Sequence, residues 1–222
     1  MSEIVNHLSR IRATLPAGVT LVAVSKTHPA EMIRQAYEAG QRLFGESRPQ
    51  ELREKYELLP KDIEWHMIGH LQTNKIKYIA PFVAMIQSVD SARLAEAIQK
   101  EALKCSRVID ILLEIHVARE ETKTGWNLDE LRDYLSSNPF AALPNLRVRG
   151  VMGIATNTDD ETVVRHDFEA LRRCFELLRP QFGEAFDTLS MGMSHDYLLA
   201  VDCGSTMVRV GSSIFGERDY SK

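Results

Sequence analysis

The stretch Val19–Pro29, VTLVAVSKTHP, decides the fold and raises the first functional question. An almost unbroken run of β-branched and aliphatic residues predicts a strand buried on both faces, as in a parallel sheet. The run ends in Ser25 and Lys26. A lysine after a strand most often extends its ammonium group into water, and this stretch alone favours that interpretation. The alternative is a partly desolvated amine with a lowered pKa that forms a Schiff base with a carbonyl.

Composition narrows the class of protein. The chain has 222 residues, of which 44% are hydrophobic and 26% charged, with a net charge of -4. These values are typical of one soluble domain, and a basic nucleic-acid-binding surface is not indicated. The three cysteines, Cys105, Cys174 and Cys203, are widely spaced and odd in number, which favours reduced thiols in the cytoplasm. Because no signal peptide or membrane-length apolar run occurs, we expect a cytoplasmic protein with a single domain over residues 1–222 and no membrane partner.

Short β-rich runs alternate with longer segments of helical periodicity along the whole chain. The predicted strands are Thr20–Ser25, Arg42–Gly45, Glu64–Ile68, Ala84–Ser88, Ile109–His116, Arg149–Ile154, Thr188–Met191 and Met207–Val210. The predicted helices are Ser2–Thr14, Pro29–Ala39, Pro49–Leu58, Thr73–Ile79, Ser91–Leu103, Leu128–Ser136, Asp160–Leu178 and Ser194–Ala200. Eight alternating strands predict a single (β/α)8 barrel of the triosephosphate isomerase (TIM) type with an extra N-terminal helix. An open doubly wound sheet is the less favoured alternative.

Glycines and serines gather after the seventh and eighth predicted strands. These residues are Ser190, Gly192, Ser194, Gly211, Ser212 and Ser213. Such loops expose backbone N–H groups and hydroxyls, and they resemble the phosphate sites found after these two strands in many barrels. Ser194 is also predicted to begin a helix, whose dipole would favour an anion. Two ordinary turns would use the same residue types, so each loop alone is weak evidence.

Arg209 lies within the short apolar eighth strand, in TMVRVGSS. A buried arginine needs a partner, either a carboxylate of the core or an acceptor on a ligand. A reactive lysine, a phosphate site and a strand arginine together indicate pyridoxal 5'-phosphate (PLP). An arginine opposite the pyridine nitrogen would keep that nitrogen unprotonated and make the ring a weaker electron sink.

Several segments carry a family resemblance: AVSKTHP, FGESRPQE, WHMIGHLQTNK, IQSVDS, RGVMGI, LSMGMSHD and GSTMVRVGSSIFGERDY. The chain resembles the pyridoxal-phosphate homeostasis protein family, the small single-barrel relatives of the alanine racemase N-terminal domain. The resemblance implies an internal aldimine on Lys26, phosphate contacts from Ser194, Gly211 and Ser212, and Arg209 facing the pyridine nitrogen. The full predicted cofactor-binding set is Lys26, Ser47, His66, Ser190, Met191, Ser194, Arg209, Gly211 and Ser212.

Two positions depart from the family pattern. Ser47 and His116 stand where the family commonly has asparagine. Both follow predicted strands and face the expected pocket, so contacts near the ring are expected to differ, and the shorter serine could act through a water molecule. His66 and His70 are four residues apart, but the spacing crosses a strand end and a glycine, and no metal site is expected there.

The expected function is binding without catalysis. Enzymes of the alanine racemase type add a β-rich domain that supplies a tyrosine base and closes the site. We expect no such domain after the eighth strand here, so one of two bases would be missing and water would reach the pocket. Tyr220 is a less favoured substitute base. The family resemblance implies a monomer that holds PLP, contributes to its intracellular supply and to amino-acid homeostasis, and would have PLP-dependent apo-enzymes as partners. A PLP-dependent racemase or decarboxylase and a cofactor-free aldolase-type barrel are the alternatives.

Overall fold

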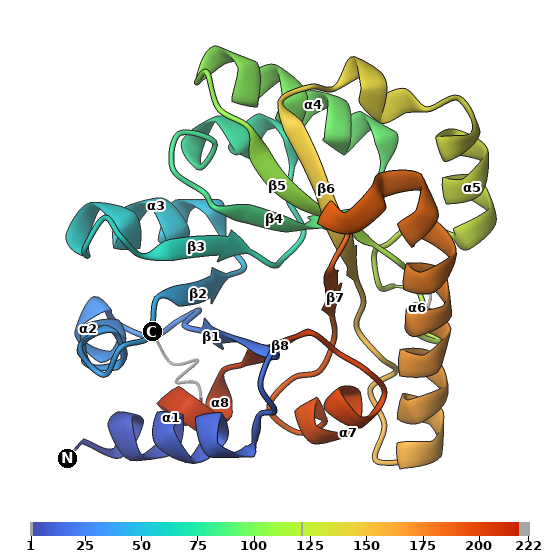
Figure 1. Cartoon of the computed structure of the whole chain (residues 1–222). Coiled ribbons are helices and arrows are strands. Elements are labelled where there is room, and N and C mark those ends of the chain that lie inside the picture. Colours follow the sequence, from blue (N-terminus) through green and yellow to red (C-terminus); the bar gives the residue numbers. More distant parts are fainter. Residues whose placement is uncertain (1, 121, 218–222) are drawn as a thin grey trace.

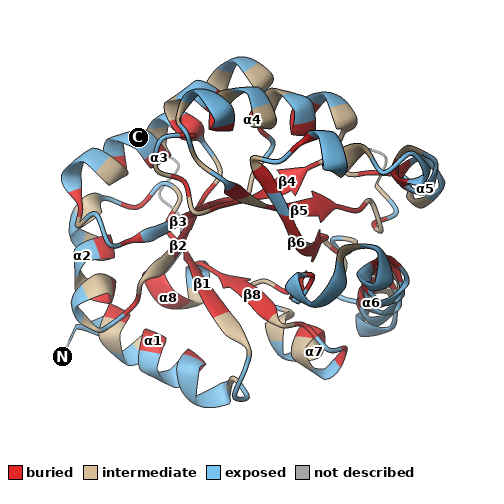
Figure 2. Ribbon diagram, turned by 45° about the horizontal axis from the view of Figure 1, so that its top comes forward, coloured by how far each residue is buried: buried red, intermediate tan, exposed pale blue. Residues whose placement is uncertain are grey.

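Eight parallel strands form a closed barrel in this protein, as a computed structural model that describes residues 2–120 and 122–217 shows (Figures 1 and 2). The strands follow one another around the barrel in chain order, and β1 pairs with β8 to close it. They are β1 (Thr20–Val24), β2 (Leu43–Glu46), β3 (Glu64–Met67), β4 (Met85–Val89), β5 (Ile109–Glu114), β6 (Leu146–Met152), β7 (Thr188–Ser190) and β8 (Met207–Val210). The predicted TIM barrel is confirmed, and the open doubly wound alternative is excluded by the β1–β8 pairing.

Helices surround this barrel and expose their outer faces, while the strands are largely buried (Figure 2). They are α1 (Glu3–Thr14), α2 (Ala30–Glu38), α3 (Pro49–Leu58), α4 (Ala92–Lys104), α5 (Leu128–Ser136), α6 (Glu161–Phe182), α7 (Tyr197–Asp202) and α8 (Ser212–Phe215), with 3-10 helices η1 (Thr73–Tyr78), η2 (Pro139–Ala142) and η3 (Gly183–Ala185). The predicted N-terminal helix is α1, which packs against α2 and α8. No helix in the described part of the chain is long and apolar enough to cross a membrane.

Strand alternation divides the buried side chains into two layers. The side chains of Val22, Met85, Leu112, Met152 and Met207 form a small cluster inside the barrel. A much larger cluster lies between the barrel and the helices, and it includes Leu21 and Ala23 of β1. The barrel interior is therefore a packed core, as expected for eight strands, and ligand chemistry is expected at the strand ends.

Several predicted boundaries were wrong for identifiable reasons. The predicted helix Thr73–Ile79 is the 3-10 helix η1, and α8 was not predicted. β6 begins at Leu146, three residues earlier than predicted, because Arg147 and Arg149 interrupt the apolar pattern while pairing with Asp110 of β5. Two helix boundaries have local causes: the Ser91 hydroxyl accepts from the Leu94 N–H at the start of α4, and Gly40 follows α2 with φ 87°.

Candidate functional site

Lys26 lies in the turn that follows β1, at the carboxyl end of the barrel, and is partly buried. The strand ladder continues to Ser25, whose N–H donates to the carbonyl oxygen of Gly45 at 3.0 Å. The next residue after the lysine, Thr27, has φ 69°, a left-handed conformation that is uncommon for a β-branched residue. Strained backbone of this kind persists only where surrounding contacts hold it, and it is often found at functional sites.

The loops after β7 and β8 lie directly against one another. The Ser194 hydroxyl accepts from the backbone N–H of Gly211 at 3.1 Å and from that of Ser213 at 3.5 Å. A Cβ at position 211 would lie 3.0 Å from the carbonyl oxygen of Val24, the last residue of β1. The predicted Ser194–Gly211 cluster is therefore assembled, and it lies beside the strand that leads into Lys26.

The prediction that Ser194 begins a helix was wrong. α7 begins at Tyr197 and has six residues, too short to provide the expected dipole. Ser194 instead lies in a turn in which the Met193 N–H donates to the Asp196 carboxylate at 2.5 Å. Gly192 starts this turn with φ 95°, and a Cβ there would lie 2.5 Å from the Cβ of Ala200. The close approach of α7 to Gly192 therefore determines the shape of this loop, and only glycine allows this approach.

A chain of hydrogen bonds crosses the barrel interior below these loops. Arg209 Nη1 donates to Ser190 Oγ at 2.6 Å, and Ser190 Oγ donates to Gln87 Oε1 at 2.7 Å. Gln87 Nε2 lies 2.9 Å from His66 Nδ1. Arg209 Nη2 also donates to the carbonyl oxygen of Gly153 at 3.0 Å. Three residues predicted for the site, Arg209, Ser190 and His66, thus belong to one network, and Gln87 connects them.

Burial determines the protonation states of Arg209 and His66, the two ends of this network. It lowers the pKa of Arg209 to about 10, an effect partly opposed by the Glu114 carboxylate, so the guanidinium stays charged at neutral pH. It lowers the pKa of His66 to about 4, which leaves the imidazole neutral. With a neutral ring whose Nδ1 faces an amide NH2, His66 accepts this hydrogen bond. His66 is therefore a fixed, uncharged member of the network.

Glu114, which sequence analysis did not select, is the last residue of β5 and is buried at the barrel mouth. It lines a cavity of about 260 Å³ together with His70, His116 and Lys123. Its Oε1 accepts from the Thr124 hydroxyl at 3.2 Å, and its buried Oε2 has no hydrogen-bond partner among the described residues. Burial raises the pKa of this carboxyl to about 7. A group that titrates near neutral pH in a cleft marks a functional region.

The remaining predicted residues differ in what they can offer. Ser47 follows β2, and the backbone at Gly69 packs so closely that a Cβ there would lie 2.7 Å from the Cβ of Ser47. The Met191 side chain is fully buried in the outer core, while its backbone pairs with Met207 and Ser205. Ser212 is exposed at the first position of α8. Tyr220 lies outside the described residues.

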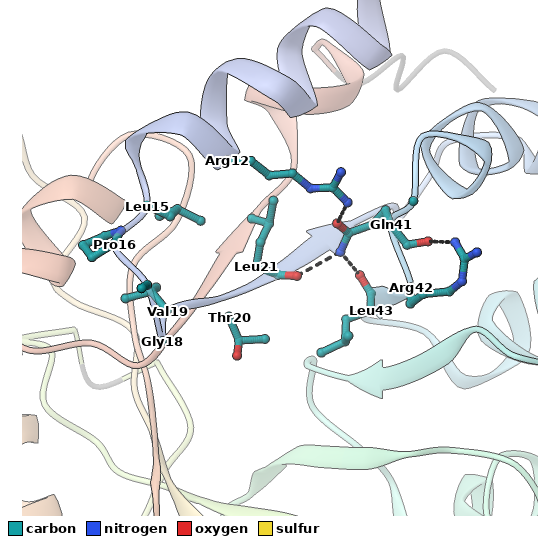
Figure 3. A pocket seen from close by; sticks show the side chains of 12 residues that line it. Arg12, Leu15, Pro16, Gly18, Val19, Thr20, Leu21, Gln41, Arg42 and Leu43 are labelled. Carbon is teal, nitrogen blue, oxygen red and sulfur yellow. Dashed lines mark hydrogen bonds between the residues drawn. The ribbon is translucent and has the colours of Figure 1, made fainter.

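Charged residues also gather at the amino end of the barrel, where they pair with one another. A cavity of about 430 Å³ there is lined by Asp110, Arg149 and Asp187, among others. Arg149 bonds both carboxylates, at 3.2 Å to Asp110 and 2.7 Å to Asp187. A second cavity of about 400 Å³ lies beside Arg12 and Gln41 between α1 and the start of β1 (Figure 3). In barrels of this type the amino end is expected to serve stability.

The donor set at the carboxyl end fits a phosphorylated aldehyde. The Ser194–Gly211 contact places a hydroxyl and backbone N–H groups together, as a phosphate requires. Lys26 is an amine at the end of the neighbouring strand. Arg209, nine-tenths buried, supplies a charged donor below the mouth. Phosphate donors, an amine and a ring-nitrogen partner are the groups that PLP uses in proteins.

Comparison with known families agrees with the fold. The family model described as alanine racemase, N-terminal domain, matches residues 1–219. The pyridoxal phosphate homeostasis protein of Aquifex aeolicus is 45% identical over 204 residues, covering 90% of this chain and 87% of the relative. The homologue with the same name from Escherichia coli is 37% identical over 239 aligned positions, covering all of both chains.

Solved structures give the same result. The structure of PipY from Synechococcus elongatus with PLP bound superposes with a TM-score of 0.87 at 38% identity, covering 96% of this chain and 100% of PipY. Alanine racemase from Bartonella henselae, solved with covalently bound pyridoxal phosphate, has a TM-score of 0.75 at 16% identity, and this chain covers 60% of it. The fold and the site thus define a barrel of the alanine racemase N-terminal domain type. Within that class, the chain belongs to the pyridoxal phosphate homeostasis protein family.

Proposed function

We propose that this protein binds PLP covalently through Lys26, as an internal aldimine, and holds the cofactor without using it for catalysis. The observation that carries this proposal is the meeting of the β1, β7 and β8 ends. There Val24, two residues before Lys26, lies beside Gly211, whose N–H donates to Ser194 Oγ. The homeostasis proteins that share 37–45% of its sequence, and PipY with PLP bound, support the same cofactor.

Each proposed contact follows from the position of its residue. Ser194, Gly211 and Ser212 bind the phosphate, because their hydroxyls and backbone N–H groups lie at adjoining loops. Arg209 faces the pyridine nitrogen while Ser190 and Gly153 hold its guanidinium. Of the other expected members, Ser47 follows β2, His66 supports Ser190 through Gln87, and Met191 would contribute only its backbone.

A direct test uses the colour of the purified protein. Wild-type protein with PLP is expected to be yellow and to keep the cofactor after borohydride reduction, with the modification mapped to the peptide that contains Lys26. Lys26→Ala is expected to abolish the aldimine absorption, while Lys75→Ala, which removes a lysine of η1, is expected to keep it. Protein that stays colourless with added PLP, or a label on another lysine, would refute the proposal.

The absence of catalysis is the second part of the proposal. An arginine opposite the pyridine nitrogen leaves the ring a weaker electron sink, which limits how far the ring can stabilise a carbanion. Homologues are named as homeostasis proteins. NMR measurement of deuterium exchange at the α-carbon of a panel of amino acids tests this part. Exchange no faster than with free PLP is expected, and fast Lys26-dependent exchange would establish an enzyme.

The cellular role follows from holding the cofactor reversibly. We infer that a cytoplasmic monomer takes up PLP, contributes to its supply and to amino-acid homeostasis, and passes it to PLP-dependent apo-enzymes, with no nucleic acid or membrane partner. Sedimentation of the loaded protein tests the monomer. Mixing it with an apo-enzyme and following that enzyme's activity tests transfer, which should exceed the rate of spontaneous release if the two proteins interact. Equal rates would refute direct transfer.

A further inference from the structure

A buried ion cluster lies outside the barrel, directly behind the Lys26 turn. Lys55 of α3 is almost fully buried, and its ammonium group donates to Glu46 of β2 and Glu51 of α3, each at 2.7 Å. The same nitrogen donates to the backbone carbonyl oxygen of Ser25 at 2.7 Å. All three protons of the ammonium group are therefore used, and one of the three bonds is to the residue that precedes Lys26.

The cluster also holds the residues on both sides of Lys26 through further bonds. The Ser25 hydroxyl donates to Glu46 Oε1 at 2.6 Å. On the other side, the Thr27 backbone N–H donates to Glu51 Oε1 at 2.6 Å. Thr27 is the residue with φ 69°, so this bond holds the unusual backbone conformation immediately after the lysine. The Ser25–Glu46, Thr27–Glu51 and Lys55–Ser25 bonds thus hold the two residues that flank Lys26.

Strand alternation explains why this arrangement concerns the mouth of the barrel. Ser25 faces outward, toward α3 and its cluster, and alternation carried one residue further, into the turn, would direct position 26 to the inner side. Fixing Ser25 and Thr27 therefore limits where the Lys26 side chain can begin. Burying an ion pair costs desolvation free energy, so a buried ion pair is weak evidence of stabilisation. Fixing one conformation is a documented use of such groups.

We propose that Lys55, held by Glu46 and Glu51, is a positioning residue that aligns the Lys26 amine for condensation with an aldehyde. This inference rests on the proposed function. In the step, the lone pair of the neutral lysine nitrogen bonds the aldehyde carbon, and the carbonyl oxygen leaves as one water molecule with both amine protons. Effective attack depends on the approach geometry of the nitrogen, and small misplacements reduce it strongly.

The test compares two ligands that share the phosphate and the ring. PLP carries the aldehyde, while pyridoxine 5'-phosphate carries an alcohol and cannot condense. We expect Lys55→Met and Glu51→Ala to lower the equilibrium constant for Schiff-base formation, measured by absorbance, about tenfold. The affinity for pyridoxine 5'-phosphate, measured by calorimetry, should change by less than about twofold, because the phosphate and ring contacts lie on β7 and β8.

Matched variants separate positioning from general stability. Glu51→Gln retains an acceptor for the Thr27 N–H and should restore most of the Schiff base that Glu51→Ala loses. Arg53→Met breaks the exposed Arg53–Glu57 pair of the same helix, also spaced i,i+4, and should change neither ligand. Hydrogen exchange of the Thr27 amide should accelerate in Glu51→Ala only. Should the fully buried Lys55 variant not fold, the partly exposed Glu51 series still decides the question.

Each remaining outcome has one meaning. A parallel loss of both ligands in Glu51→Ala and Lys55→Met would show a merely structural cluster and overturn the inference. Unchanged Schiff-base formation in the folded Glu51→Ala variant would overturn it as well. The proposed function itself would instead be refuted if wild-type protein bound both ligands equally and showed no aldimine absorption that depends on Lys26.

Discussion

The two ends of the barrel both carry charged side chains but treat them differently. At the amino end, Arg149 pairs with Asp110 and Asp187. At the carboxyl end, Arg209 is nine-tenths buried yet bonds neutral acceptors, a serine hydroxyl and a backbone carbonyl oxygen. Glu114, also nine-tenths buried, keeps one oxygen without a hydrogen-bond partner in the described part of the chain.

We interpret this difference as a division between groups that support the fold and groups proposed to contact a ligand. The paired charges at the amino end are partly exposed and satisfy one another, so we expect them to contribute to stability. Arg209 and Glu114 form no direct ion pair among the described residues; buried charged groups of this kind cost free energy, and a fold retains them where they serve another purpose. The following variants test this comparison.

Gly192→Ala and Gly18→Ala form a pair, one from each end, and should give the largest difference. Both glycines have positive φ, but a Cβ at position 192 would collide with Ala200, whereas a Cβ at position 18 meets nothing within 4 Å. We expect Gly192→Ala to lower the free energy of unfolding by ~3 kcal/mol, and Gly18→Ala by ~1 kcal/mol. Urea denaturation measures both. Equal losses would show that the positive φ alone determines the cost at position 192 and that the close contact with Ala200 is unimportant.

Glu114→Gln should remove a pH dependence of stability. Burial raises the pKa of Glu114 to about 7, so between its unfolded pKa near 4.5 and pH 7 the folded state holds a proton that the unfolded state has lost. Wild-type stability therefore falls as the pH rises through this range, by ~2–3 kcal/mol from this group. The variant should lose this part of the slope between pH 5 and 8, as measured by denaturation. An identical slope in both proteins would contradict the raised pKa.

Arg209→Gln tests the ring contact with a smaller effect. Glutamine can still donate to Ser190 but carries no charge opposite the pyridine nitrogen. We expect the Schiff base to form, its absorption maximum to shift, and PLP affinity to fall about fivefold, the loss of roughly one hydrogen bond. Arg149→Gln at the amino end is the control and should leave the spectrum unchanged. An unchanged spectrum in Arg209→Gln would place Arg209 away from the ring.

The sequence was sufficient for the barrel and for the residues that follow its strands. Short β-rich runs between segments of period 3.6 identified eight strands, and two of the residues gathered after the seventh and eighth strands, Ser194 and Gly211, are in contact in the structure. The sequence did not reveal interactions between residues that are far apart along the chain and meet only in the folded barrel. Gln87 joins Ser190 to His66 across the barrel, and only the closure of the sheet brings β4 and β7 within reach.

The sequence analysis did not single out Lys55, for the same reason. Lys55 fits the pattern of an exposed helix position, yet it is buried because Glu46 points outward from β2 to meet it. A glutamate inside the apolar strand FGE was the available signal, since a charge within a strand needs a partner. Ser194 shows the opposite error. Serine is a favourable N-cap residue, so a helix was predicted to begin there, but Gly192 and Asp196 hold Ser194 in a turn.

Arg12→Met should have the smallest effect, and this effect should be confined to stability. Arg12 donates to Gln41 Oε1 and to the carbonyl oxygen of Ala39, each at 2.9 Å, and Gln41 in turn bonds Leu21 and Leu43 (Figure 3). Because Gln41 keeps its two strand contacts without Arg12, we expect a loss of only ~1 kcal/mol in the free energy of unfolding. PLP affinity and the aldimine spectrum should not change, since this site joins α1 to the amino ends of β1 and β2. A weakened cofactor signal with retained stability would mean that the two ends of the barrel are coupled, and that dividing them into a supporting end and a binding end is wrong.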